Sequence, residues 1–377
     1  MFRFVNKNII IMKNFFLYLL ILLAMSSCTS TNKPDQFSLD ITISNVDGKK
    51  IFLNERIDNN WKAIDSVVIV EGKAAFKGTA TGPKLIRIGL EGSRAMPLLF
   101  IEPANILLTL EADNLNQTKV IGSATHSRYV AFSEGHKRFD EEIEKIYQQY
   151  VDLRNNEETE KAEEVYKQID VLMSQQTDYL VQFIKDNPAD LVSHFLLYRY
   201  SHIFELEQFE PLVNGFDQDY VSEYLLELRK RLVILQNVAI GKPFTDFTLN
   251  DPSGNPVALS SKVGSKLLLV DFWASWCGPC RRENPNIVAI YNDYKEKGFD
   301  VFGVSLDRNR DQWVEAIEAD QLTWTHVSDL AYWDSEAGKL YGINSIPHSV
   351  LLDENGIIIA KNLSGEKLRE KVASLLN

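Results

Sequence analysis

The sequence predicts three structural parts: an antiparallel β domain, a helical middle region and a C-terminal α/β domain with a central mixed sheet covered by helices on both faces. Three observations support this prediction. Apolar and polar residues alternate along residues 37–43, as in a half-buried strand. From Phe132 onward, apolar residues recur at the spacing of one helix face. After Gly241, strongly apolar strands alternate with helical segments.

The N-terminus has the pattern of an export signal. Basic residues precede an apolar run at residues 15–25, which is followed by Ser26-Ser27-Cys28. The run is too short to span a membrane, which takes roughly 20 residues, but it suits a signal-peptide core. The residues before Cys28 resemble a bacterial lipobox, which implies that this cysteine is lipidated. We expect a signal peptide over residues 1–27 and a polar tether over 28–36; a plain secreted protein or an uncleaved anchor is the alternative.

Residues 37–122 are predicted to form the β domain. Turn signals such as Asp47-Gly48 and Thr81-Gly82-Pro83 separate short apolar runs. The predicted strands cover residues 37–43, 66–70, 85–90, 98–101 and 106–110. No catalytic group of residues is evident in them. The region is similar to a β domain found in some bacterial lipoproteins.

Residues 123–239 are predicted to be helical. One apolar stripe runs through Phe132, Phe139, Ile143, Ile146, Tyr150 and Leu153, and a second through Val165, Ile169, Leu172, Leu180, Phe183 and Ile184. Asn187-Pro188 then predicts a cap followed by proline in the first turn of another helix. We interpret the stripes as helical core packing, with partner binding as the alternative.

Residues 240–377 are predicted to form the α/β domain, which Gly241-Lys242-Pro243 opens. A β-hairpin is expected around residues 251–255. The expected strands cover residues 266–273, 300–305, 323–327, 349–353 and 357–361. A helix is expected to follow the first strand to residue 297, with further helices near 312–319, 335–341 and 366–376.

Charge and cysteine content exclude several classes of protein. The formal net charge is −12, which argues against a nucleic-acid partner, because binding to the phosphate backbone normally needs a basic face. The chain has only three cysteines, Cys28, Cys277 and Cys280, too few for a disulfide-stapled scaffold. A zinc site at the close pair is also disfavoured, since no further cysteine is available and the histidines are scattered. We expect no metal and no cofactor.

The segment Trp276-Cys277-Gly278-Pro279-Cys280 follows the most apolar strand and opens a helix. At a helix start, free N–H groups and the helix dipole favour an anion, which lowers the pKa of a thiol there. Cys277 is therefore predicted to attack a substrate disulfide. Cys280, nearly one turn on, can resolve the mixed disulfide. The alternative is an inert cysteine pair in a core.

This segment resembles the thioredoxin family. The predicted hairpin, an insertion after the second strand and Glu283, three residues past Cys280, narrow the resemblance to the membrane-tethered TlpA/ResA-like branch. The resemblance covers residues 241–377 and implies a thioredoxin-like fold and thiol–disulfide exchange.

Two carboxylates are candidates for proton transfer. Asp271 lies where the thioredoxin family places its buried acid, although many TlpA-like members have a neutral residue there. Glu283 is on the same helix face as Cys280. Either could accept the proton of Cys280 if burial raises its pKa. An ordinary solvated glutamate is the alternative for Glu283.

Ser345-Ile346-Pro347-His348 resembles the family's cis-proline loop. The resemblance implies a cis bond before Pro347, backbone pairing of Ile346 with the substrate chain, and exclusion of metal ions from the thiols. Trp276, Gly278 and Pro279 are expected to contact substrate beside these two residues.

These observations predict a thiol–disulfide oxidoreductase of the cell envelope that faces the periplasm and acts on protein disulfides or dithiols. A lipid anchor would hold it at a membrane, and an upstream membrane donor would supply electrons. We expect a reductase. The alternatives are a disulfide oxidase or isomerase, a thiol peroxidase, a copper-binding module with His348 as the candidate ligand, or a binding module formed by the first 200 residues.

Overall fold

The computed structural model describes residues 35–57 and 60–376. The described residues divide into two compact units, one ending at Ile169 and the other beginning at Asp170, so the boundary falls within helix α3 (Thr159–Asp186). The predicted signal peptide and Cys28 lie outside the described residues. The expected boundaries after residues 122 and 239 stay predictions. None of the helices in the described ranges combines the length and the apolar character needed to cross a membrane.

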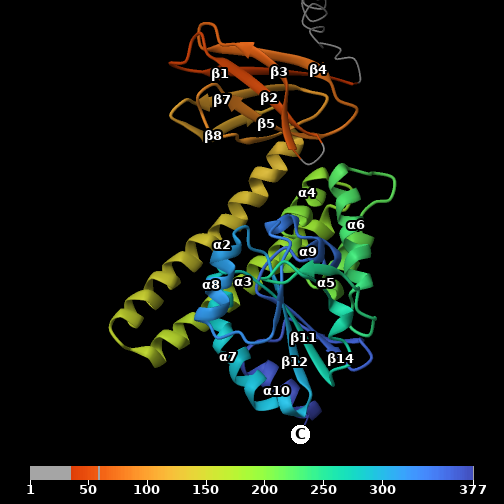
Figure 1. Cartoon of the computed structure of the whole chain (residues 1–377). Coiled ribbons are helices and arrows are strands. Elements are labelled where there is room, and N and C mark those ends of the chain that lie inside the picture. The colour runs from red at the N-terminus through yellow and green to blue at the C-terminus, as the bar shows by residue number, and fades with distance from the viewer. Residues whose placement is uncertain (1–34, 58–59, 377) are drawn as a thin grey trace, which may run out of the picture. The chain divides into compact units, whose positions relative to one another are not determined.

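The first unit contains two four-stranded sheets (Figure 1). Their strands are β1 (Gln36–Ile43), β2 (Lys50–Ile57), β3 (Asn60–Val68), β4 (Lys73–Thr79), β5 (Lys84–Leu90), β6 (Leu98–Ile101), β7 (Asn105–Glu111) and β8 (Asn114–Ile121). One sheet has the order β4-β1-β7-β8 and the other β3-β2-β5-β6. The pairs are antiparallel except β1 and β7, which are parallel.

Side-chain alternation explains why these strands form a sandwich. Along β1, Leu39, Ile41 and Ile43 are buried, while Asp40 and Thr42 between them are exposed. They belong to one apolar cluster with residues of the other sheet, such as Ile51 and Leu53 on β2. Each sheet thus buries one face against the other. The predicted N-terminal β domain is confirmed.

Helix α2 (Ala124–Asn155) follows β8 directly. Its N-cap is Ser123, whose Oγ accepts the N–H of His126 at 3.0 Å. The carboxylate of Glu102 accepts the N–H groups of Ala124 and Thr125 and the hydroxyl of Thr125. These contacts satisfy the free N–H groups at the helix start and tie it to the end of β6.

The second unit begins within α3 and continues through α4 (Leu191–Arg199), η1 (Ser201–Ile203), α5 (Leu206–Asn214) and α6 (Glu223–Asn237). The prediction that Asn187-Pro188 starts a helix is wrong. The Nδ2 of Asn187 donates to the carbonyl of Phe183 at 2.8 Å, so it caps the end of α3. The next helix begins after Asp190, whose carboxylate accepts the N–H of Val192 at 2.9 Å.

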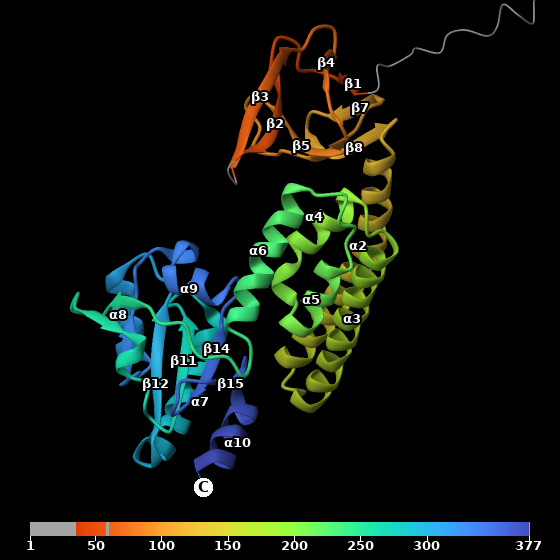
Figure 2. The same cartoon turned by 90° about the vertical axis from the view of Figure 1, so that its right-hand side faces the viewer.

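The C-terminal part of this unit contains a five-stranded mixed sheet of order β13-β12-β11-β14-β15 (Figure 2). Its strands are β11 (Leu267–Trp273), β12 (Phe299–Ser305), β13 (Thr325–Val327), β14 (His348–Asp353) and β15 (Ile358–Lys361). Strand β12 pairs in parallel with the central β11, and β13 pairs in parallel with β12. On the other side, β14 is antiparallel to β11, and β15 is antiparallel to β14. The predicted hairpin is formed by β9 (Thr248–Asn250) and β10 (Pro256–Ala258).

Every residue of β11 is buried, because helices cover both faces of the sheet. The helices are α7 (Gly278–Tyr294), α8 (Arg310–Ala319), α9 (Glu336–Tyr341) and α10 (Gly365–Leu376), with short 3-10 turns η2 (Leu259–Ser261), η3 (Lys295–Lys297) and η4 (Tyr332–Asp334). Helices α7 and α10 pack together, and α9 packs on α6. The predicted insertion is α8 with β13, placed between β12 and α9. The fold class predicted for this domain is confirmed.

Candidate active site

Cys277 lies at the junction between the central strand and α7. Its N–H donates to the carbonyl of Ala274 at 3.1 Å, which closes a turn after β11. Cys277 is the N-cap of α7, and its sulfur accepts the N–H of Cys280 at 3.2 Å. Pro279 lies in the first turn of the helix, where a missing N–H costs nothing. The predicted position of Cys277 at a helix start is confirmed.

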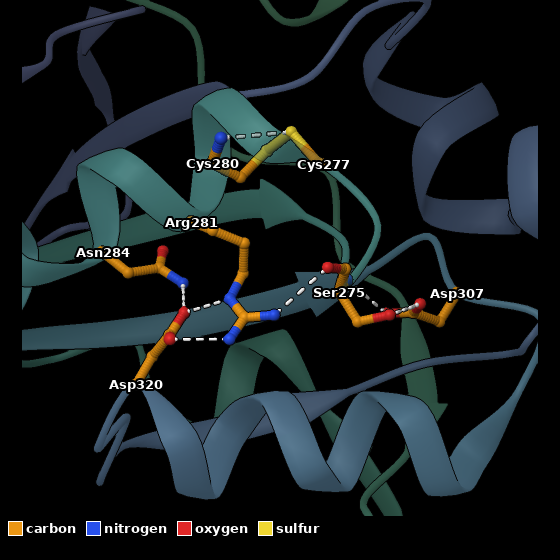
Figure 3. The surroundings of a disulfide bond; sticks show 7 residues. All are labelled: Ser275, Cys277, Cys280, Arg281, Asn284, Asp307 and Asp320. Carbon is orange, nitrogen blue, oxygen red and sulfur yellow. Dashed lines mark hydrogen bonds and ion pairs between the residues drawn. A yellow bond between two sulfur atoms is a disulfide. The ribbon is translucent and has the colours of Figure 1, made fainter.

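Cys277 and Cys280 form a disulfide, with their Cα atoms 5.3 Å apart (Figure 3). Cys277 is 4% exposed and Cys280 is 1% exposed. The residues between the two cysteines, Gly278 and Pro279, are exposed, whereas the cysteines themselves are almost fully buried. Two cysteines joined in this way can pass between a disulfide and a dithiol by thiol–disulfide exchange.

The peptide bond between Ile346 and Pro347 is cis, as predicted. Ile346 is partly buried against the apolar core, and Pro347 is exposed. His348 follows as the first residue of β14 and pairs with Phe272 of β11. The loop therefore lies at the end of β11 that leads into the dithiol turn.

Asp271 and Glu283 occupy very different surroundings. Asp271 is 5% exposed in β11, between Gly303 of β12 and Ser349 of β14. Burial, together with the charge of Glu283, raises the pKa of Asp271 to about 7. A carboxyl group with this pKa can take up or release a proton at neutral pH.

Glu283 is held between two helices. Its Oε1 accepts the N–H of Gly365, the first residue of α10, at 2.6 Å. Its Oε2 accepts the side-chain amide of Asn286 at 3.2 Å. Glu283 is therefore not an ordinary solvated glutamate. One of its carboxylate oxygens is fixed at a helix N-terminus, where a negative charge is stabilised.

A hydrogen-bond network around Ser275 was not predicted from the sequence (Figure 3). Asp307, just after β12 and 1% exposed, accepts the N–H of Ser275 at 3.0 Å and its hydroxyl at 2.5 Å. It also accepts the hydroxyl of Ser305 at 2.7 Å. The buried carboxylate is thus satisfied by three donors, as a buried charge requires.

Arg281 fixes the same turn from the other side. Its guanidinium forms a fork with Asp320, and its Nη1 donates to the carbonyl of Ser275 at 3.2 Å. The amide of Asn284 donates to Asp320 at 2.7 Å. Burial acts to raise the pKa of Asp320, but these hydrogen bonds and the charge of Arg281 outweigh it and hold the pKa below its usual value. Three backbone and side-chain groups of Ser275 are therefore held in place beside Cys277.

Two tryptophans flank this turn. Trp273 is fully buried in the apolar core of the domain. Trp276 is 45% exposed, immediately before Cys277. Gly278 is exposed in the first turn of α7, and an added Cβ there would meet nothing closer than Arg282 at 3.6 Å.

No metal site accompanies the dithiol in the described part of the chain, where no three His, Cys, Asp or Glu side chains form a metal-binding group. His348, the candidate copper ligand, is half-buried. Burial, with smaller contributions from Lys361 and Arg231, lowers its pKa to about 3.

Comparison with known families gives two matches. The model of the Redoxin family matches residues 239–376. A model described as a domain of unknown function, DUF4369, matches residues 37–129. The chemistry-bearing region and the β domain are thus similar to two separate families.

Curated relatives match the C-terminal region. The thiol-disulfide oxidoreductase ResA of Bacillus thuringiensis subsp. konkukian is 28% identical over 141 residues, which is 37% of this chain and 79% of the relative. ResA of Geobacillus thermodenitrificans is also 28% identical over 141 residues, which again is 37% of this chain and 79% of the relative.

Solved structures match the same region. The thioredoxin domain of a thiol-disulfide oxidoreductase from Bacteroides vulgatus is 38% identical, with a TM-score of 0.35, over 37% of this chain and 99% of that structure. A thiol-disulfide oxidoreductase from Bacteroides fragilis is 36% identical, with a TM-score of 0.34, over 36% of this chain and 100% of that structure.

Proposed function

The C-terminal domain of this chain belongs to the TlpA/ResA-like branch of the thioredoxin superfamily, and we propose that it exchanges disulfides with protein substrates through Cys277 and Cys280. The domain is a thioredoxin-like protein-disulfide oxidoreductase. The observation that carries the proposal is the position of the Cys277 sulfur at the N-terminus of α7, bonded to Cys280 and hydrogen-bonded to its N–H.

The proposed reaction starts from the reduced pair. The Cys277 thiolate attacks one sulfur of a substrate disulfide, which forms a mixed disulfide and releases the other substrate sulfur as a thiolate. Cys280 then attacks the Cys277 sulfur, and the second substrate thiol leaves. The protein pair becomes a disulfide, and the substrate gains two electrons and two protons.

Proton transfer is assigned to the two carboxylates. Cys280 must lose its proton to attack, and its burial disfavours a free thiolate. Asp271 has a pKa of about 7, so it is the first candidate for the acceptor. Glu283, which contributes to that pKa, is assigned a supporting role.

Substrate contacts are assigned to the rim of the dithiol. Ile346 would pair through its backbone with an extended substrate chain, as β-strand addition does elsewhere. The approach to Cys277 would be lined by Pro347, Trp276, Gly278 and Pro279. The exposed positions of Trp276, Gly278 and Pro347 support this assignment.

We propose that the protein works as a reductase in the cell envelope, anchored on the periplasmic side through a lipidated Cys28 and supplied with electrons by a membrane donor. The apolar leader and the small residues before Cys28 support the anchor. The Cys-Gly-Pro-Cys dithiol and the buried Asp271 support the direction.

The reduction potential of the Cys277–Cys280 couple tests this direction. The protein is equilibrated in glutathione buffers, and the free thiols are counted by mass after alkylation. A potential near about −270 mV is expected for a reductase, whereas a value near about −120 mV would indicate an oxidant. A Cys277→Ser variant is the control that must lose the couple altogether.

A further inference from the structure

Three aromatic rings gather beside the dithiol turn. The ring centroid of Trp276 is 5.1 Å from that of Tyr332 and 6.0 Å from that of Trp333, and those two are 5.7 Å apart. Trp276 is 45% exposed and Trp333 is 39% exposed. We call these three residues the aromatic cluster. Large rings so close to one another and so open to solvent are unusual outside binding surfaces.

The loop that carries Tyr332 and Trp333 is strained and firmly held. Leu330 and Tyr332 have φ of 55° and 59°, in the left-handed region that residues with a Cβ rarely adopt. The side chain of Asp329 accepts the N–H of Ala331 at 3.2 Å and the N–H of Glu336 at 2.7 Å. Strain kept in place by such bonds is typical of a site whose shape matters.

A cation completes the surface. The guanidinium carbon of Arg308 lies 3.9 Å from the ring centroid of Tyr332. Arg308 is exposed, and among the residues that the structure describes no carboxylate lies within ion-pair distance of it. A stacked guanidinium retains donors for a carboxylate of a partner.

We propose that the aromatic cluster and Arg308 form a specificity site that selects substrate polypeptides with a large apolar side chain and a carboxylate close to their reactive cysteine. This inference rests on the proposed disulfide exchange. Trp276 directly precedes Cys277, so a chain joined to Cys277 has its flanking residues beside these rings. The rings offer apolar area for one such residue, and Arg308 offers a charge for its neighbour.

Four peptides test the proposal. Each carries one cysteine linked as a mixed disulfide to 2-nitro-5-thiobenzoate, with Phe or Gly beside the cysteine and Glu or Lys two residues away. The reduced full chain attacks the peptide sulfur and releases the yellow thiobenzoate, and Cys280 then frees the peptide thiol. Two electrons pass from the dithiol to the mixed disulfide, so the reaction needs no other reductant.

The expected result is a preference measured as a ratio of kcat/KM values. The wild-type protein should favour Phe over Gly, and Glu over Lys, by about tenfold each. Tyr332→Ala and Trp333→Ala should reduce the ratio for Phe over Gly to about twofold. Arg308→Glu should invert the preference between Glu and Lys.

Matched control variants separate these effects from general ones. Tyr147→Ala removes an aromatic ring of similar exposure on α2, and Lys367→Glu makes the same charge change on α10. Neither should alter the ratios. If the wild-type protein reduces all four peptides at one rate, the specificity site is overturned while disulfide exchange stands. If none of the peptides reacts, the proposed function itself fails.

A second copy of the chain is the competing occupant of the aromatic cluster. Sedimentation of the wild-type protein and of Trp333→Ala decides between a second copy and a substrate polypeptide as the occupant. A dimer that Trp333→Ala dissociates, with unchanged peptide ratios, would overturn the proposal. A monomer in both cases, with the ratios shifted as expected, supports it.

Discussion

Asp271 on β11 and Glu283 on α7 are electrostatically coupled. Burial is the main cause that raises the pKa of Asp271 to about 7, and the negative charge of Glu283 adds to it. Glu283 keeps its position through the N–H of Gly365 at the start of α10. The pair therefore provides a proton acceptor that is poised at neutral pH, within the strand that leads to Cys277.

Replacement of these carboxyl groups should slow resolution of the mixed disulfide. Because general base catalysis contributes about 10²–10⁴-fold, Asp271→Asn should lower the rate of Cys280 attack at pH 7 by at least about tenfold. Glu283→Gln, which can still accept the bond from Gly365, should have a smaller effect. Rapid acid quench and mass analysis measure the decay of the mixed disulfide. Asp293→Asn, on the same helix as Glu283, is the control. Unchanged rates in both test variants would contradict the assignment of these carboxylates as the base.

The same burial should make the stability of the domain depend on pH. The pKa of Asp271 is about 7 when folded and near 3.8 when unfolded, so the folded state binds more protons between these values. The unfolding free energy must then fall as pH rises from about 4 to about 7. Asp271→Asn removes the ionisable group. The unfolding free energy of the variant should therefore exceed that of wild type by an amount that grows across this pH range to roughly 4 kcal/mol. Urea unfolding at a series of pH values measures the difference; a pH-independent difference would contradict the buried, titrating carboxyl.

The Ser275–Asp307 contact should stabilise the dithiol turn. Ser275→Ala removes a hydroxyl donor from a carboxylate that is 1% exposed and that cannot turn to water. The expected loss is about 1–3 kcal/mol of unfolding free energy. Ser261→Ala, which removes an exposed hydroxyl bonded only to the carbonyl of Ala258, should cost less than about 0.5 kcal/mol. Equal effects of the two changes would show that the buried network does not hold the turn.

Gly303 is expected to tolerate no side chain. It pairs with Asp271 on one side and with His326 on the other, and an added Cβ would lie 2.3 Å from Nδ1 of His326. His326 cannot move aside easily, because it is 4% exposed and packs against Trp273 and Trp324. Gly303→Ala should therefore destabilise the domain by about 1–3 kcal/mol or more in urea unfolding. Gly82→Ala, with open space around it, is the control, and His326→Ala should restore part of the loss in the double variant.

The sequence predicted much of the second unit because its strands are strongly apolar and its motif is local. The dithiol, the helix start and the cis bond before Pro347 all lie within short segments with strong conformational preferences. In the first unit, strands β2, β4 and β8 were not predicted. Burial alternates along β4 (Lys73–Thr79), but the sequence does not show it, because the buried Ala74 is followed by an exposed alanine; in β8 only one residue is buried.

The network around Ser275 could not be found in the same way. Asp307 is 32 positions from Ser275 along the chain, and Asp320 is 39 positions from Arg281. No pattern in the neighbouring sequence identifies hydrogen-bond partners that are so far apart along the chain. One signal was present: Ser305 ends and Asp307 follows a buried strand parallel to β11, and polar residues at the ends of neighbouring parallel strands meet at one edge.

The acidity of the two thiols in the reduced protein shows whether the start of α7 activates Cys277. Iodoacetamide alkylation is followed from pH 5 to 10, and peptide mapping assigns each rate to Cys277 or Cys280. We expect Cys277 to react first, and at a pH where free cysteine, with a pKa of about 8.5, is still mostly protonated. Faster reaction of Cys280, or a pH profile of Cys277 no more acidic than that of free cysteine, would contradict it.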